Sequence, residues 1–190
     1  YDSGDYLKVW DTLMEHLDVP SFRAKQKAAL AEGKYIGLGF GTGVECSGMA
    51  SEILVPMENQ PGYGAASVRL DPRGKALVSF GDAAQGQGHE TTISQVAAHE
   101  FGIHPDDIIV REGDTETTPF GSGTIGARTG SYVMSGVSTA CRVLKDKMAV
   151  IMAHDLELEA EPEDFEFVDG EIIYAKDSNI RKGFGEMADR

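Results

Sequence analysis

The chain has 190 residues, of which 41% are hydrophobic and 25% are charged, ordinary values for one globular domain or two small ones. Its 17 Lys and Arg residues stand against 31 Asp and Glu residues, giving a net charge of −14. That charge repels phosphate backbones and anionic membranes and argues against a nucleic-acid partner. No apolar run approaches the roughly 18 residues of a membrane span, and the start shows no secretory signal pattern. The chain opens at Tyr1 without an initiator Met, so we expect a portion of a longer polypeptide.

The first 33 residues are expected to form two helices. Apolar residues recur at helical spacing over residues 6–17, which predicts the first helix. The segment 18–20 contains a proline and should interrupt it. Ser21 is expected to cap a second helix over residues 22–32.

The next segment, residues 34–44, has glycine at every second position from Gly37 to Gly43, mostly with bulky side chains between. On a β-strand all these glycines would share one face. Because glycine weakens a strand, the pattern predicts that another backbone, a helix or a ligand approaches that face closely.

The middle of the chain alternates strand and helix signals. Residues 64–70 and 75–80 have β-like composition and are joined by the turn Asp71-Pro72-Arg73-Gly74. An amphipathic helix is expected to run through residues 93–101, and residues 108–110 should begin another strand.

The last third is expected to contain a long helix and a hairpin. The helix should cover residues 131–154, and strands 165–168 and 171–174 should turn at Asp169-Gly170, a pairing typical of type I′ turns. Residues 155–171 hold nine acids and no Lys or Arg, which favours a solvated face or loop. Without regular βαβ alternation, the fold class is α+β, with mixed or antiparallel strands packed against helices.

The cysteines and histidines do not indicate a metal site. Cys46 and Cys141 are far apart and belong to no Cys/His cluster, so we expect two buried thiols in a reducing, cytoplasmic environment. His89, His99 and His104 lack the spacing of a zinc motif. Surface or capping histidines are the simpler interpretation.

The first motif that could carry chemistry is Gly86-Gln87-Gly88-His89-Glu90, at the start of a helix. Backbone amides at a helix N-terminus favour an anionic or hydrogen-bond-accepting ligand, and glycine lets that ligand come close. A tight turn with Thr91 or Thr92 capping the helix remains the alternative. The motif is neither a Rossmann fingerprint nor a Walker A loop.

A second loop, residues 121–129, also precedes a helix and repeats this arrangement with glycines, hydroxyls and one cation, Arg128. If the two loops converge, they form a polar cradle for a large ligand with many acceptor atoms.

Taken together, five motifs in this order resemble the molybdenum-cofactor-binding large subunit of the xanthine oxidase family, in its carbon monoxide dehydrogenase and aldehyde oxidase-like branch. They are residues 1–6, 33–39, 86–92, 112–115 and 123–128. The resemblance implies an α+β portion of a cofactor-binding domain. It divides the chain into a helical lead-in (1–33), a core with both cofactor loops (34–154) and an acidic segment with a hairpin (155–190).

The resemblance also implies which residues contact the cofactor, molybdopterin, with its cytosine dinucleotide form as one alternative. They are Gln87, Gly88, His89, Thr124, Gly126, Ala127, Arg128 and Thr129. No residue of this chain is expected to be catalytic or to bind metal. Glu186 lies in Gly183-Phe184-Gly185-Glu186, which imitates the family's catalytic-base motif but falls too early in family order and resembles a helix start.

The activity implied is oxidation of CO, an aldehyde or an N-heterocycle by a molybdenum hydroxylase. Expected partners are the rest of the large subunit, an FAD-binding medium subunit and a [2Fe–2S] small subunit. The chain alone is expected to be inactive. The alternative from another class is a catalytically empty domain that serves as a scaffold or small-ligand binding module.

Overall fold

The structure, a computed structural model, describes residues 4–189 apart from 46, 49–51, 53–55 and 57–62. The predicted buried thiol at Cys46 therefore lies outside the described residues. Contacts divide the chain into an N-terminal unit, Tyr1–Val44, and a C-terminal unit, Glu45–Arg190.

The N-terminal unit contains the two predicted helices, α1 (Tyr6–Leu17) and α2 (Val19–Ala31). Asp5 caps α1 by accepting a hydrogen bond from the Lys8 amide at 3.0 Å. The prediction that Ser21 caps α2 is wrong, because Asp18 takes that position and accepts from the Ser21 amide. Proline at residue 20 is tolerated there, since the first turn of a helix needs no amide donor.

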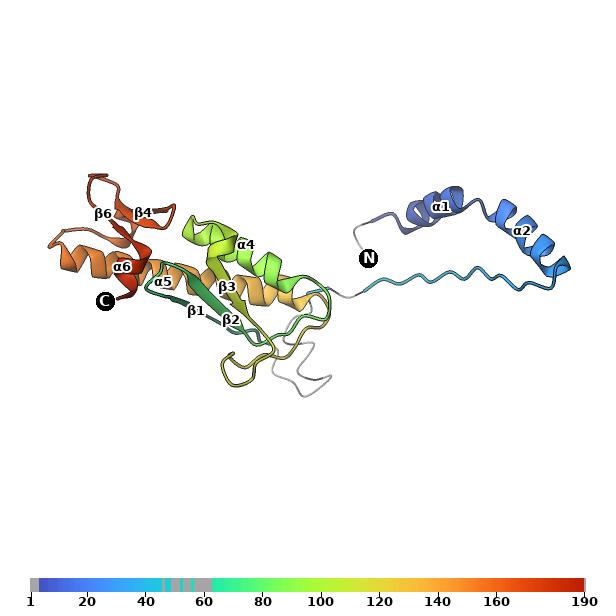
Figure 1. The fold of residues 1–190 in the computed structure, drawn as a ribbon, viewed down its shortest axis with the longest axis horizontal. Coiled ribbons are helices and arrows are strands. Elements are labelled where there is room, and N and C mark those ends of the chain that lie inside the picture. The colour runs from blue at the N-terminus through green and yellow to red at the C-terminus, as the bar shows by residue number, and fades with distance from the viewer. Residues whose placement is uncertain (1–3, 46, 49–51, 53–55, 57–62, 190) are drawn as a thin grey trace. The chain divides into compact units, whose positions relative to one another are not determined.

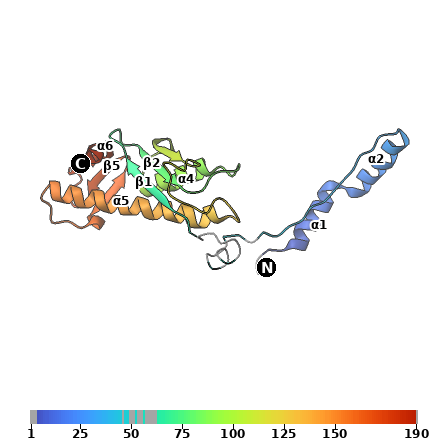
Figure 2. The ribbon, with the colours of Figure 1, turned by 90° about the horizontal axis from the view of Figure 1, so that it is seen from below.

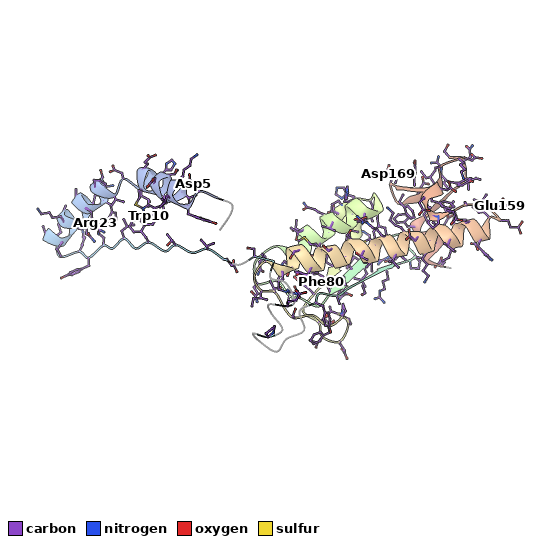
Figure 3. The ribbon with its side chains drawn as sticks, turned by 180° about the vertical axis from the view of Figure 1, so that it is seen from behind. Asp5, Trp10, Arg23, Phe80, Glu159 and Asp169 are labelled. Atoms are coloured by element: carbon purple, nitrogen blue, oxygen red, sulfur yellow. The ribbon has the colours of Figure 1, made fainter. Side chains whose placement is uncertain are left out.

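The predicted strand over residues 34–44 is also wrong. The segment is extended but pairs with no described strand, and no heavy atom lies within 4 Å of a Cβ built on any of its alternating glycines. It is held in its own unit by side chains: Gln26 Nε2 donates to the Ile36 carbonyl at 2.8 Å, and Trp10, which Figure 3 labels on α1, meets Phe40 edge-on at 5.4 Å. Alternation assigns side chains to faces, but a strand also requires a partner edge for its backbone.

The C-terminal unit is built on a three-stranded sheet in the order β1 (Ala66–Leu70), β2 (Ala76–Phe80), β3 (Ile108–Arg111). β1 pairs antiparallel with β2, and β2 pairs parallel with β3. The helix α4 (His89–Phe101) connects the two parallel strands. The sequence predicted these strands and this helix, but not the parallel pairing.

Both α4 and the long helix α5 (Met134–Asp155) pack against this sheet (Figure 1). A π-helical turn, η2 (Thr129–Val133), leads into α5, which runs the length of the unit in Figure 2. The fully buried core side chains come from the sheet and from both helices, which also contact each other: Val78, Phe80, Ile93, Phe101, Val137, Cys141 and Met152.

The predicted C-terminal hairpin is confirmed as β4 (Phe165–Val168) and β5 (Glu171–Tyr174). Its turn has positive φ at both Asp169 (51°) and Gly170 (78°), as a type I′ turn requires. The sequence did not predict β6 (Arg181–Gly183), which completes an antiparallel sheet before α6 (Phe184–Ala188).

This small sheet lies at one end of α5 (Figure 1). The Asp169 amide donates to the Gly102 carbonyl at 2.7 Å and so attaches the turn to the end of α4 (Figure 3). The short 3₁₀ helices η1 (Pro105–Asp107) and η3 (Pro162–Asp164) precede β3 and β4.

The acidic segment 155–171 is only partly solvated. Three of its carboxylates form ion pairs with cations that follow it in sequence: Asp164 with Lys176 at 2.8 Å, Glu171 with Arg181 at 3.2 Å and Asp155 with Lys182 at 3.4 Å. Others, such as Glu159, are exposed (Figure 3).

The predicted α+β class is confirmed by this combination of helices with mixed and antiparallel sheets. Within the described part of the chain, no helix has the length and apolar character needed to cross a membrane.

Candidate functional site

The two motif loops lie at the same end of the main sheet. Because β2 and β3 are parallel, their carboxyl ends meet at one edge. The Gln87 loop, residues 81–88, leaves β2 there. The chain after β3 leads from that edge to the Arg128 loop, residues 121–129, and so to η2 and α5.

The two loops cross at two glycines. A Cβ built on Gly121 would lie 2.7 Å from the Gly81 carbonyl carbon, and one built on Gly81 would collide with the Gly121 amide. Only residues without a side chain allow the two backbones to pass this closely.

Hydrogen bonds then tie the crossed loops together. Thr129 Oγ1 donates to Asp82 Oδ2 at 2.6 Å, and both residues are buried, at 3% exposure each. Thr124 Oγ1 donates to the Ala83 carbonyl, also at 2.6 Å. The sequence analysis left convergence of the two loops as a condition, and the structure brings them into direct contact.

The outer part of the Gln87 loop is open backbone. Gly86 and Gly88 have φ of 107° and 75°, and nothing lies within 4 Å of a Cβ built on either. Gly88 occupies the N-cap position of α4 and provides no side-chain cap. Thr92 donates backwards to the Gly88 and His89 carbonyls. The alternative in which Thr91 or Thr92 caps this helix is therefore wrong.

His89 points inward. It is 4% exposed, meets Phe80 edge-on at 6.2 Å, and its Nδ1 lies 3.5 Å from Glu112 Oε2. That nitrogen is the one buried side-chain polar atom without a hydrogen bond in the part of the chain described. The same Glu112 oxygen accepts from the Ala84 amide at 3.0 Å. Interpreting His89 as a surface or capping histidine is wrong.

The other two histidines fit the simpler interpretation. His99 is exposed on α4, and His104 caps η1, its ring accepting from the Asp106 amide at 3.3 Å. Among the described residues, no three His, Cys, Asp or Glu side chains come together in a way that could hold a metal ion.

Arg128 is also buried, at 2% exposure, with its guanidinium 4.2 Å from the centre of the Tyr132 ring. Its neighbours in the loop face outward to different degrees. Ala127 is exposed with φ of 56°, and Gly126 accepts a hydrogen bond from the Gly48 amide at 2.7 Å.

The eight predicted contact residues therefore fall into three groups by burial. Gln87, Gly88 and Ala127 are exposed, Thr124 and Gly126 are half-buried, and His89, Arg128 and Thr129 are buried. Sequence reasoning missed Asp82 and included Glu112 in a family motif, residues 112–115, without giving it a role in the site. The only local signal for Asp82 was its place directly after Gly81 at the end of a strand.

Asp114, near Glu112, closes the turn that follows β3. A hydrogen bond from the Thr117 hydroxyl, supported by the Glu116 amide, holds the pKa of this carboxyl below its usual value. Asp114 is thus committed to the turn between β3 and the Arg128 loop.

Comparison with known proteins identifies the family. The family model for the molybdopterin cofactor-binding domain matches residues 12–190. The carbon monoxide dehydrogenase large chain of Hydrogenophaga pseudoflava is 34% identical over 95% of this chain and 23% of its own length. The nicotine 6-hydroxylase large subunit of Paenarthrobacter nicotinovorans is 34% identical over 95% of this chain and 22% of its own.

A solved structure agrees with these matches. The Cu,Mo-CO dehydrogenase in its carbon monoxide reduced state has a TM-score of 0.65 and 32% identity, and the match covers 99% of this chain and 24% of that one. The chain thus spans less than a quarter of the length of these relatives. The resemblance found in the sequence is confirmed: the chain belongs to the molybdopterin cofactor-binding domain family.

Proposed function

We propose that this chain forms part of the large subunit of a molybdopterin-dependent hydroxylase and contributes two loops to its cofactor site. The full enzyme would oxidise CO, an aldehyde or an N-heterocycle. This proposal is supported by the family match and by relatives named as a carbon monoxide dehydrogenase and a nicotine 6-hydroxylase.

The single observation that carries the proposal is the joined pair of loops at the carboxyl edge of the sheet. A bulky ligand rich in acceptor atoms needs backbone donors and room. The Gln87 loop offers open glycines and the uncapped start of α4, whose dipole favours negative charge. The residues present therefore fit a phosphate-bearing pterin.

The contact roles follow from burial. Gln87, Gly88 and Ala127 are exposed, so their side chains or backbone would contact the cofactor directly. Thr124 and Gly126 are half-buried and would contact it through the part of each residue that remains exposed. The Gln87 side chain folds back, its Oε1 accepting from the Gln85 amide at 2.6 Å, which leaves the amide NH₂ group to donate. His89, Arg128 and Thr129 are buried, and they would support the two loops by packing under the exposed residues.

When bound, the cofactor supplies a metal that accepts electrons from the substrate. The described part of this chain adds binding and orientation, not acid–base catalysis. Glu186, the one imitation of a catalytic base, accepts from the Gly183 amide at 3.1 Å and caps α6, which supports its assignment to a helix start.

The remaining partners belong to the same proposal. Electrons would leave through a [2Fe–2S] small subunit and an FAD-binding medium subunit, and the rest of the large subunit would complete the site. A cytoplasmic location is supported by the buried, unpaired thiol of Cys141.

The test is to purify the full-length subunit from a host that makes the cofactor and to measure molybdenum and pterin per subunit. We expect both in the wild type and a lower content in Gln87→Ala. Gln95→Ala, an exposed glutamine further along α4, is the matched control and should not change the content. Absence of metal and pterin in the wild type would support the catalytically empty module instead.

A further inference from the structure

Two side-chain hydrogen bonds join the Gln87 loop to the Arg128 loop across long stretches of the chain. Most Ser and Thr hydroxyls in the described residues close local turns, as when Ser135 donates to the Ser131 carbonyl. The bonds from Thr129 to Asp82 and from Thr124 to Ala83 join residues 47 and 41 positions apart. They connect the Arg128 loop to the Gln87 loop and to no other element.

Asp82 lies at the centre of this junction. It follows Gly81, where the loops cross, and its carboxylate is almost completely buried. A buried carboxylate requires donors to offset the cost of leaving water. Thr129 provides one at 2.6 Å. The single proton of the Thr129 hydroxyl is thus committed to Asp82 and is not presented to a ligand.

The Gln87 loop is fastened on its other side as well. Glu112, directly after β3, accepts from the Ala84 amide at 3.0 Å. Residues 82–84 are therefore held at three consecutive positions, by Thr129, Thr124 and Glu112. The following residues, 85–88, are exposed.

We propose that Asp82 is a positioning residue that fixes the two cofactor loops relative to each other, and that Thr129 acts through Asp82 rather than by touching the cofactor. This inference rests on the proposed function of the loops. Fixing the loops in advance reduces the ordering cost of binding, so breaking the pair should weaken retention of the cofactor.

A double-mutant cycle in the full-length subunit tests this directly. Asp82→Ala, Thr129→Val and the double variant are compared for the rate at which molybdenum and pterin are lost after dilution. We expect about tenfold faster loss in each single variant, the effect of a buried group left without its partner. The double variant should be no faster than either single one.

Two controls separate positioning from general damage. Thr129→Ser keeps the hydroxyl and should restore wild-type retention. Ser67→Ala removes a hydroxyl pair, Ser67 Oγ with Ser79 Oγ at 2.7 Å, that joins two strands but neither loop, and it should leave retention unchanged.

A measurement without cofactor keeps the inference separate from the proposed function. In the cofactor-free subunit, hydrogen exchange of two hydrogen-bonded loop amides, those of Ala84 and Arg128, should accelerate about tenfold in both single variants, and not further in the double variant. A wild type that never holds pterin would defeat the proposed function, while these exchange rates would still decide whether Asp82 fixes the loops.

Two results would contradict the positioning role of Asp82. If the effects of the two single substitutions multiplied, so that the double variant lost the cofactor about a hundred times faster than the wild type, Thr129 would contact the cofactor independently of Asp82. Retention and exchange unchanged in Asp82→Ala would overturn the inference altogether.

Discussion

At the residue scale, the crossing of Gly81 and Gly121 leaves no room for a side chain. Gly121→Ala would place its Cβ 2.7 Å from a backbone carbon, so one loop must move. We expect the free energy of unfolding of the chain to fall by about 1–3 kcal/mol, the usual cost of overpacking, as measured by chemical denaturation.

The matched control for this substitution is Gly183→Ala. Gly183 has φ of −70° and no heavy atom within 4 Å of the added Cβ. It should be nearly neutral. Equal stability of the two variants would show that the loops do not cross as described.

Cys141 leads to a second prediction, on reactivity. Burial, and to a lesser extent the nearby Glu100 carboxylate, raises the pKa of the Cys141 thiol from 9.0 to about 12. Because the thiolate is the reactive form, we expect no alkylation of Cys141 by iodoacetamide at pH 8 in the folded chain and complete alkylation in denaturant. Mass spectrometry of the Cys141 peptide measures both.

The raised pKa of Cys141 also determines how its contribution to stability changes with pH. A pKa that is higher in the folded than in the unfolded state means that the contribution of the thiol to stability is complete below pH 9 and is lost as the pH rises toward 12. Rapid labelling of the native chain at pH 8 would contradict the burial of this side chain.

The residues that form the site differ in how well the sequence could predict them. Glycines and hydroxyls before a helix are a local pattern, so Gly86, Gly88 and Thr124 could be found. The partnership of Asp82 with Thr129 spans 47 residues and depends on how two loops meet. Burial of Arg128 depends on packing in the same way, and no local pattern encodes either.

At the element scale, Glu100 connects α4 to α5. It accepts from Ser138 and from both Nε and Nη2 of Arg142, at 3.1 and 2.9 Å for the arginine. Burial of Glu100 works to raise its pKa, but these hydrogen bonds and the charges of Arg142 and Lys145 outweigh burial and hold the pKa below its usual value.

We expect Glu100→Gln to lower the free energy of unfolding by about 1–2 kcal/mol at pH 7. A lowered folded pKa contributes stability above the unfolded value of 4.5, and that contribution is lost as the pH falls through the folded pKa. The difference in free energy of unfolding between wild type and variant should therefore be smaller at pH 3 than at pH 7, as measured by denaturation curves at both pH values. Glu159→Gln, at an exposed site, should have the same free energy of unfolding as the wild type at both pH values. If Glu100→Gln destabilised the chain equally at pH 7 and pH 3, the charge of Glu100 would not be what stabilises the fold.

Elements with a complete local signal were predicted well. The pattern of α4 ends in Gly102, and the Asp169-Gly170 turn fixes its hairpin through positive φ at both positions. Residues 34–44 have an equally regular pattern and form no strand in the described chain. The difference is that a helix or a tight hairpin contains its own hydrogen-bond partners, whereas an isolated strand does not.

At the scale of the whole molecule, burial is unevenly distributed. The core lies entirely in the C-terminal unit, and none of the residues of α1 or α2 is buried. Composition predicted an ordinary globular chain because it averages over both units.

The exposed apolar side chains of α1 lead to the last prediction. Leu7 is 77% exposed and Val9 70%, beside Tyr6, Leu13 and Leu17, each more than 40% exposed. Tyr6, Val9, Leu13 and Leu17 follow one another at spacings of three and four residues and so share one face of α1, and an exposed apolar face of this kind binds hydrophobic dyes and promotes association. We expect the 190-residue chain to bind anilinonaphthalene sulfonate and to self-associate in sedimentation experiments, and Val9→Glu with Leu13→Glu to reduce both. Val143→Glu changes a single exposed residue on α5, 63% exposed, and should have little effect, because scattered apolar side chains are common on protein surfaces. Dye binding equal in the wild type and the α1 variant would place the apolar surface elsewhere in the chain.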